Sequence, residues 1–60
     1  MTAYRVYLLD GSDRFVRADA VEAESDEDAV RQARTVMGAS PKAEVWELGR
    51  HVATLDTSSF

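Results

Sequence analysis

The sequence has no cysteine, isoleucine or asparagine, and only one proline, one lysine and one histidine. Without cysteine, no disulfide can stabilise this chain of 60 residues. At this length, the free energy gained by burying apolar surface nearly cancels the conformational entropy lost on folding. Chains this short often need a metal ion or a partner subunit for stability, so both have to be considered.

The sequence also has no long apolar run and no basic stripe. No stretch approaches the ~20 apolar residues of a membrane span, and residues 1–9 lack the apolar core and cleavage site of a signal peptide. The net charge of −4 and the pI near 4.7 disfavour a nucleic acid or an anionic membrane as the main partner. We therefore expect a cytoplasmic protein with no membrane partner, for which nucleic acid is a disfavoured partner.

The N-terminal part of the sequence predicts two strands, at about 4–10 and 14–23. Residues 4–10 are rich in aromatic and branched side chains and end at a cluster of turn formers, Asp10–Asp13. In the second segment, Phe15 and Val16 compete for one face of the strand. This imperfect alternation predicts a bulge or twist near residues 17–20.

The middle of the sequence predicts a helix over about 26–37. Ser25 occupies the N-cap position, and Asp28 follows at the third helical position as a short capping box. The apolar residues then recur at helical spacing, which draws one stripe along the helix. Gly38 is a natural C-terminal cap, and Pro41 prevents the helix from continuing.

Two further strands are predicted at about 43–48 and 51–55, with residues 56–60 as a frayed tail. Gly49 and Arg50 suit a two-residue hairpin turn, with glycine first as a type II′ turn requires. In that register Trp46, Leu48 and Leu55 face the helix, and Trp46 is the expected anchor of the core. Val45 and Val52 then face away from the helix.

These elements predict one α+β domain over residues 1–60, a four-stranded antiparallel sheet with one helix on one face, in the order ββαββ. Four segments of the sequence carry a resemblance: residues 4–10, 21–30, 44–47 and 50–53. In these segments the chain resembles a set of small proteobacterial proteins that look like stand-alone ββαββ domains. The resemblance implies this element order and a bacterial cytoplasmic setting, and it brings no activity and no site residue.

The inventory of reactive side chains is poor for an enzyme. Nucleophilic catalysis needs an activated nucleophile beside a base, and the chain offers a single histidine, His51, at the predicted hairpin turn. A domain this small also lacks room for a ligand pocket in its own core, so any small-molecule site has to form between subunits. We expect no enzymatic activity, no cofactor and no metal ion. Whether His51 titrates or binds a ligand stays open.

An acidic run spans residues 19–28 and contains no basic residue. Its spacing matches no calcium loop. It can dock a basic protein partner through Glu22, Glu24 and Asp26, or it is a solvated surface with first-turn helix acids.

The sheet face away from the helix is expected to carry an apolar patch of Tyr7, Leu9, Val45 and Val52. An apolar patch rimmed by charge is typical of a binding surface. Together with the thin stability margin, the patch predicts a non-enzymatic protein interaction module that forms a homodimer. The alternative is a small regulator that binds a ligand or a nucleic acid through this face or through a dimer groove.

Overall fold

The structure is a computed structural model that describes residues 1–56. Its elements follow the order ββαββ: β1 (Thr2–Leu9), β2 (Phe15–Ala23), α1 (Asp26–Met37), β3 (Lys42–Glu47) and β4 (Arg50–Asp56). The predicted α+β fold class is therefore confirmed. Asp56 belongs to β4 and not to the predicted tail, and the rest of that tail lies outside the described residues.

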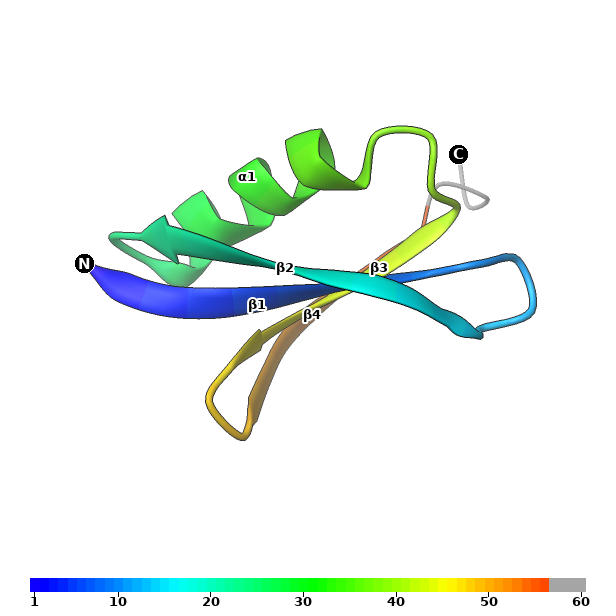
Figure 1. Cartoon of the computed structure of the whole chain (residues 1–60). Helices are drawn as coiled ribbons and strands as arrows, with labels where there is room; N and C mark the ends of the chain where they lie inside the picture. The colour runs from blue at the N-terminus through cyan, green and yellow to red at the C-terminus, as the bar shows by residue number, and fades with distance from the viewer. Residues whose placement is uncertain (57–60) are drawn as a thin grey trace.

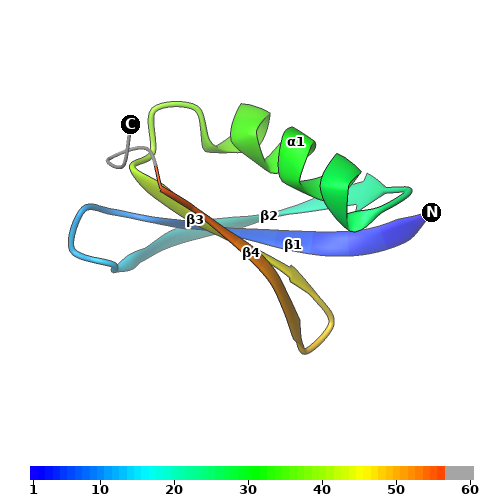
Figure 2. The ribbon, with the colours of Figure 1, turned by 180° about the vertical axis from the view of Figure 1, so that it is seen from behind.

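The four strands form one antiparallel sheet in the order β2-β1-β3-β4. The two hairpins, β1–β2 and β3–β4, are joined by long-range pairing of β1 with β3 at the centre of the sheet. Figure 1 shows the β3–β4 hairpin crossing the β1–β2 hairpin, with α1 lying along one side of the sheet. The view from behind in Figure 2 shows no element on the other side. One sheet face is therefore left uncovered by the described residues.

Local signals in the sequence set both ends of α1. The Ser25 hydroxyl accepts a hydrogen bond of 3.1 Å from the Asp28 backbone N–H, as an N-cap does. The Asp28 carboxylate in turn accepts one of 3.4 Å from the Glu24 backbone N–H. At the other end Gly38 has a φ of 53°, in the left-handed region that favours glycine. The helix therefore spans the range that the sequence predicts.

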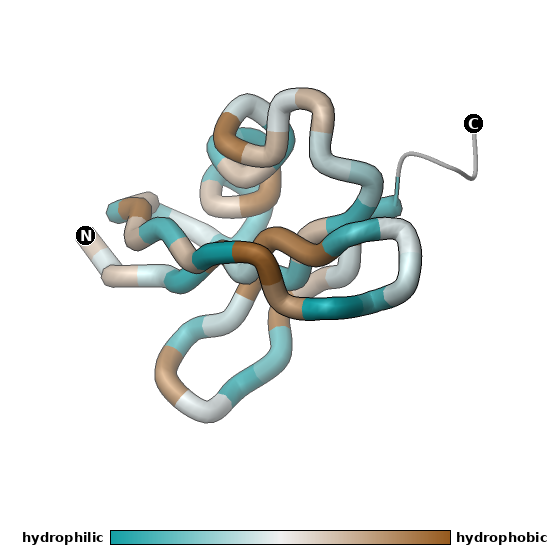
Figure 3. Tube along the Cα trace, turned by 45° about the vertical axis from the view of Figure 1, so that its right-hand side comes forward, coloured by the Kyte–Doolittle hydropathy of each residue, from teal (hydrophilic) through white to brown (hydrophobic). Residues whose placement is uncertain are grey.

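The core lies between α1 and the covered face of the sheet. Every second residue of β1, namely Tyr4, Val6 and Leu8, points toward the helix and is buried. Polar residues occupy the β1–β2 turn, and apolar residues recur along the strands that leave it (Figure 3). The other buried apolar residues are Ala23, Ala29, Ala33, Met37, Ala43, Val45 and Leu55.

The predicted orientation of β3 is wrong. Val45 is fully buried and pairs with Val6, so Val45 and not Trp46 faces the helix. The cause is the pairing of β3 with β1, which sets Val45 opposite the buried Val6 and Trp46 opposite Arg5. The turn also lies one residue earlier than predicted, because Glu47 pairs with Arg50 and leaves Leu48 and Gly49 as the two turn residues. Leu48, predicted to lie in the core, is 89% exposed and has a φ of 56°.

Two register shifts place extra residues in the outer strands. In β2 the extra residue is Val16, because Arg17 pairs with Leu8 while Phe15 pairs with Leu9. The bulge predicted at residues 17–20 therefore lies one position earlier. In β4 the extra residue is Val52. Val52 is partly buried and packs against the core, so its predicted place on the uncovered face is also wrong.

Candidate interface on the uncovered sheet face

The candidate site is the sheet face that α1 does not cover, here called the open face. Because side chains alternate along a strand, the residues between the buried ones in β1 and β3 point to this face. Tyr7, Leu9 and Trp46 lie there and are half-buried, whereas Phe15 is 63% exposed. The residues of the open face used below are Arg5, Tyr7, Leu9, Phe15, Ala18, Lys42, Glu44, Trp46 and His51.

An aromatic row crosses the open face, with one ring from each of the four strands. The rings of Tyr7 and Phe15 lie 6.2 Å apart between centroids and are tilted by 59°. The rings of Trp46 and His51 lie 5.2 Å apart in an edge-to-face arrangement. Both distances fall in the range of favourable ring contacts. The aromatic row, Phe15, Tyr7, Trp46 and His51, therefore crosses the sheet as two pairs of rings in contact, one on β1 and β2 and one on β3 and β4.

Charged groups of both signs border the aromatic row. The Trp46 indole N–H donates a hydrogen bond of 3.0 Å to Glu44 Oε1, which fixes both side chains on the open face. Arg5, opposite Trp46 in the register, is exposed and makes no hydrogen bond or ion pair within residues 1–56. His51 Nε2 lies 2.9 Å from the Thr54 hydroxyl. The aromatic row is therefore bordered by a cation, Arg5, and by a carboxylate, Glu44.

Of the four residues predicted for the apolar patch, the structure keeps two on the open face. Tyr7 and Leu9 lie there, whereas Val45 is in the core and Val52 packs against it. Sequence reasoning missed Trp46, because its size favoured a core position. Each of Val45 and Trp46 fits a period-two pattern, so only the pairing of β3 with β1 decides between them.

The acidic side chains of residues 19–28 have different surroundings in the structure. Glu22 and Glu24 are exposed. Asp26 accepts a hydrogen bond of 2.8 Å from the Tyr4 hydroxyl and binds Arg50 through both carboxylate oxygens. The Arg50 guanidinium and the Tyr4 hydroxyl lower the pKa of Asp26 from 3.8 to about 2. Asp26 is therefore exposed but already engaged by Tyr4 and Arg50 of the same chain.

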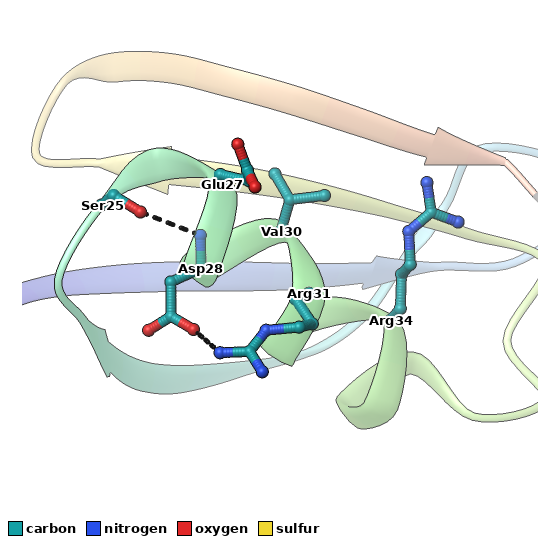
Figure 4. Close-up of a pocket in the computed structure, with 6 residues that line it drawn as sticks. All are labelled: Ser25, Glu27, Asp28, Val30, Arg31 and Arg34. Carbon is teal, nitrogen blue, oxygen red and sulfur yellow. Dashed lines mark hydrogen bonds and ion pairs between the residues drawn. The ribbon is translucent and has the colours of Figure 1, made fainter.

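Asp28 is also engaged within its own helix. It binds the Arg31 guanidinium and accepts a hydrogen bond of 3.2 Å from the Gln32 side chain. The Arg31 guanidinium, together with hydrogen bonds from Glu24 and Gln32, holds the pKa of Asp28 below its usual value. Figure 4 shows Asp28 between Ser25 and Arg31 at a shallow hollow on the outer side of α1, with Arg34 further along the helix. The hollow is built from surface side chains of one helix.

A second hollow lies at one end of the sheet, where the β1–β2 turn approaches the start of β3. Lys42 and Asp13 both line it and pair with each other, with Lys42 Nζ 2.6 Å from Asp13 Oδ1. The Asp13 carboxylate raises the pKa of Lys42 above its usual value.

Within residues 1–56, no three His, Asp or Glu side chains are grouped closely enough to hold a metal ion. No helix in this part of the chain has the length and apolar character that crossing a membrane requires. Comparison with known proteins found no family model, no curated protein and no solved structure that matches the chain.

Proposed function

We propose that the chain is a non-enzymatic protein interaction module of the cytoplasm that forms a homodimer through the open face. The observation that carries the proposal is the aromatic row. Trp46, the largest apolar side chain, lies on this face with Tyr7 and Phe15 and not in the core. A contiguous apolar surface rimmed by charge marks an interaction site, and aromatic residues are enriched in interface cores.

The size of the open face suits a dimer interface. The Cα atoms of the molecule span 31 by 21 Å in the two longer directions. A rectangle of these dimensions covers roughly 650 Å², which is an upper bound on the projected backbone area of the open face; an interface of standard size buries ~800 Å² on each partner, side chains included. A second copy is therefore large enough to cover the face.

The composition of the core gives a second argument. Four of its ten buried residues are alanines, which contribute little apolar area. A second sheet packed on the open face would enclose the half-buried Tyr7, Leu9 and Trp46 in a second apolar layer. Burial of that layer adds stability that the single chain lacks.

The test measures molar mass by light scattering over a hundredfold dilution, with thermal melts on the same samples. We expect a mass near twice 6.6 kDa and a melting temperature that falls on dilution. Trp46 provides a second readout because it is the single tryptophan. Its emission should move to longer wavelength as the dimer dissociates. A mass of one chain over the whole range, with a melt independent of concentration, would contradict the proposal.

A substitution locates the interface. Trp46→Thr keeps a side chain suited to a strand and removes the indole from the open face. We expect this variant to be monomeric. The matched control is Leu48→Ala, which removes an apolar side chain that is 89% exposed at the hairpin turn. The control should dimerise as the original chain does.

The aromatic row also favours one alternative, the binding of single-stranded nucleic acid. Rings on a sheet face can stack bases, and Arg5 lies beside Trp46. The net charge of −4 and the carboxylate of Glu44, which is hydrogen-bonded to Trp46, weigh against it. Retardation of a labelled RNA or DNA oligonucleotide that weakens as salt is raised would support this alternative instead.

A further inference from the structure

The register of the sheet arranges four side chains of the open face as the corners of a rectangle. Arg5 pairs with Trp46, and Tyr7 pairs with Glu44. One diagonal of the rectangle therefore joins the two aromatic residues, and the other joins Arg5 to Glu44. Because Leu9 pairs with Phe15, the line from Trp46 through Tyr7 continues to Phe15.

We propose that two copies pack their open faces together about a two-fold axis that runs along the line of Phe15, Tyr7 and Trp46. This inference rests on the proposed function and adds to it the arrangement and the recognition of the partner. A two-fold axis between packed faces exchanges positions on its two sides. Arg5 then lies over the partner's Glu44, and Glu44 over the partner's Arg5.

The charged side chains of the open face fit this exchange. Arg5 has no ion pair of its own within residues 1–56. The Trp46 indole occupies only Oε1 of Glu44, so Oε2 is left as an acceptor. Arg5 therefore offers donors and Glu44 offers an acceptor, on opposite sides of the axis. Two copies satisfy both pairs at once.

The apolar contacts agree with the same axis. The three aromatic side chains lie on the axis, where each meets the same residue of the partner. Leu9 lies on one side of the axis, and the small side chain of Ala18, which pairs with Tyr7, lies on the other. A large side chain therefore meets a small one. From the strand spacing of about 4.8 Å and the rise of about 3.4 Å per residue, the strands of the two copies cross at roughly 70°, nearer to orthogonal than to aligned sheet packing.

The competing arrangement has the axis along the other diagonal, from Arg5 to Glu44. That axis places Arg5 over the partner's Arg5 and Glu44 over the partner's Glu44. Like charges in contact across an interface strongly disfavour association. Charge therefore selects the axis along the aromatic line.

Two charge reversals test the axis. Arg5→Glu places two carboxylates in contact in its homodimer, and Glu44→Arg places two guanidinium groups in contact. Each should raise the Kd of self-association by at least about 100-fold. When the two variants are mixed, both opposite-charge pairs are restored, so a heterodimer should form with a Kd near that of the original chain.

The net charges of the two variants exclude overall electrostatic attraction as the cause of a heterodimer. The original chain has a net charge of −4, so Arg5→Glu gives about −6 and Glu44→Arg about −2. Both variants are acidic, and general attraction cannot bring them together. Arg34→Glu and Glu24→Arg make the same two charge changes away from the open face. Each control should self-associate as the original chain does.

The outcomes separate this inference from the proposed function. Light scattering gives the mass, and circular dichroism shows whether each variant is folded. If the original chain dimerises while either reversal leaves its Kd unchanged, or if mixing restores no dimer, the axis is wrong and the dimer stands. If a single variant unfolds when it cannot pair, recovery of structure on mixing supports the axis. A monomeric original chain overturns both proposals.

Discussion

Arg50 holds both carboxylate oxygens of Asp26, with Nη1 3.0 Å from Oδ2 and Nη2 2.9 Å from Oδ1. The pair joins the first residue of β4 to the first residue of α1, which lie 24 positions apart in the sequence. Arg50 also binds Glu47 across the hairpin, at 2.8 Å from Nη2. Bidentate pairs of this kind fix geometry as well as charge, so the guanidinium ties the hairpin tip to the start of the helix.

The Asp26–Arg50 pair predicts how stability depends on acid. The pKa of Asp26 is lowered from 3.8 to about 2, so its stabilising contribution is complete well above pH 3.8 and is lost as the pH falls toward about 2. Asp26→Asn should therefore lower the melting temperature at pH 7 and flatten its decline between pH 5 and pH 2. Glu24→Gln removes the same charge next to the helix and is the control. If the melting temperatures of the original chain and of Asp26→Asn fall in parallel between pH 5 and pH 2, Asp26 is not the group responsible for the acid dependence.

Tyr4 is expected to affect how stability falls at alkaline pH, at the other end of the pH range from Asp26. Its ring is buried, and the hydrogen bond to Asp26, then burial, then the Asp26 charge raise its pKa above 10.0. The neutral Tyr4 hydroxyl therefore stabilises the fold fully below pH 10. This contribution is lost as the pH rises past the pKa that Tyr4 has in the folded chain. Tyr4→Phe keeps the ring and removes the hydroxyl. It should lower the melting temperature at pH 7 by about 5 °C and weaken the alkaline decline of stability. If the melting temperature of Tyr4→Phe equals that of the original chain at pH 7 and also above pH 10, the hydrogen bond contributes nothing to stability.

How far the sequence predicts this fold depends on how local each signal is. The helix could be predicted to the residue, because Ser25 and Gly38 act on the backbone within one turn. The face of β3 could not, since Val45 and Trp46 are both apolar neighbours. Their choice of side is made by the pairing of Val45 with Val6, 39 positions away.

The same difference between local and long-range signals explains why only part of the open face could be predicted. Tyr7 and Leu9 follow from the alternation within β1 alone. Trp46 depends on the register between strands. The network of Tyr4, Asp26 and Arg50 has no local signal at all, because it joins three separate elements.

Replacing Leu48 by glycine is expected to stabilise the fold. It has a φ of 56° in the β3–β4 turn, a conformation that costs a residue with a Cβ roughly 1–2 kcal/mol, and its side chain is 89% exposed. Leu48→Gly should raise the free energy of unfolding by about 0.5–1 kcal/mol after the greater entropy of glycine in the unfolded chain is subtracted. Urea unfolding measures the change. Leu48→Ala is the control, because it removes the exposed side chain and keeps the strained backbone. Equal stability of the two variants would contradict the prediction.

Val45 and Trp46 predict opposite behaviour from neighbouring positions. Val45 is fully buried against the helix-facing side of β1, so Val45→Ala leaves a cavity. It should lower the free energy of unfolding by about 2 kcal/mol, at every protein concentration. Trp46→Thr acts on the open face. Its melting temperature should equal that of the original chain at high dilution and should not change with concentration.

The contrast between these two variants also tests the register of β3. If the turn were Gly49–Arg50 and Trp46 faced the helix, the effects would be exchanged, because the cavity would then arise at Trp46. In that case Trp46→Thr would unfold the chain at all concentrations and Val45→Ala would be tolerated. Urea unfolding of both variants at two protein concentrations a hundredfold apart distinguishes the two registers. The buried pairing of Val45 with Val6 predicts the first result.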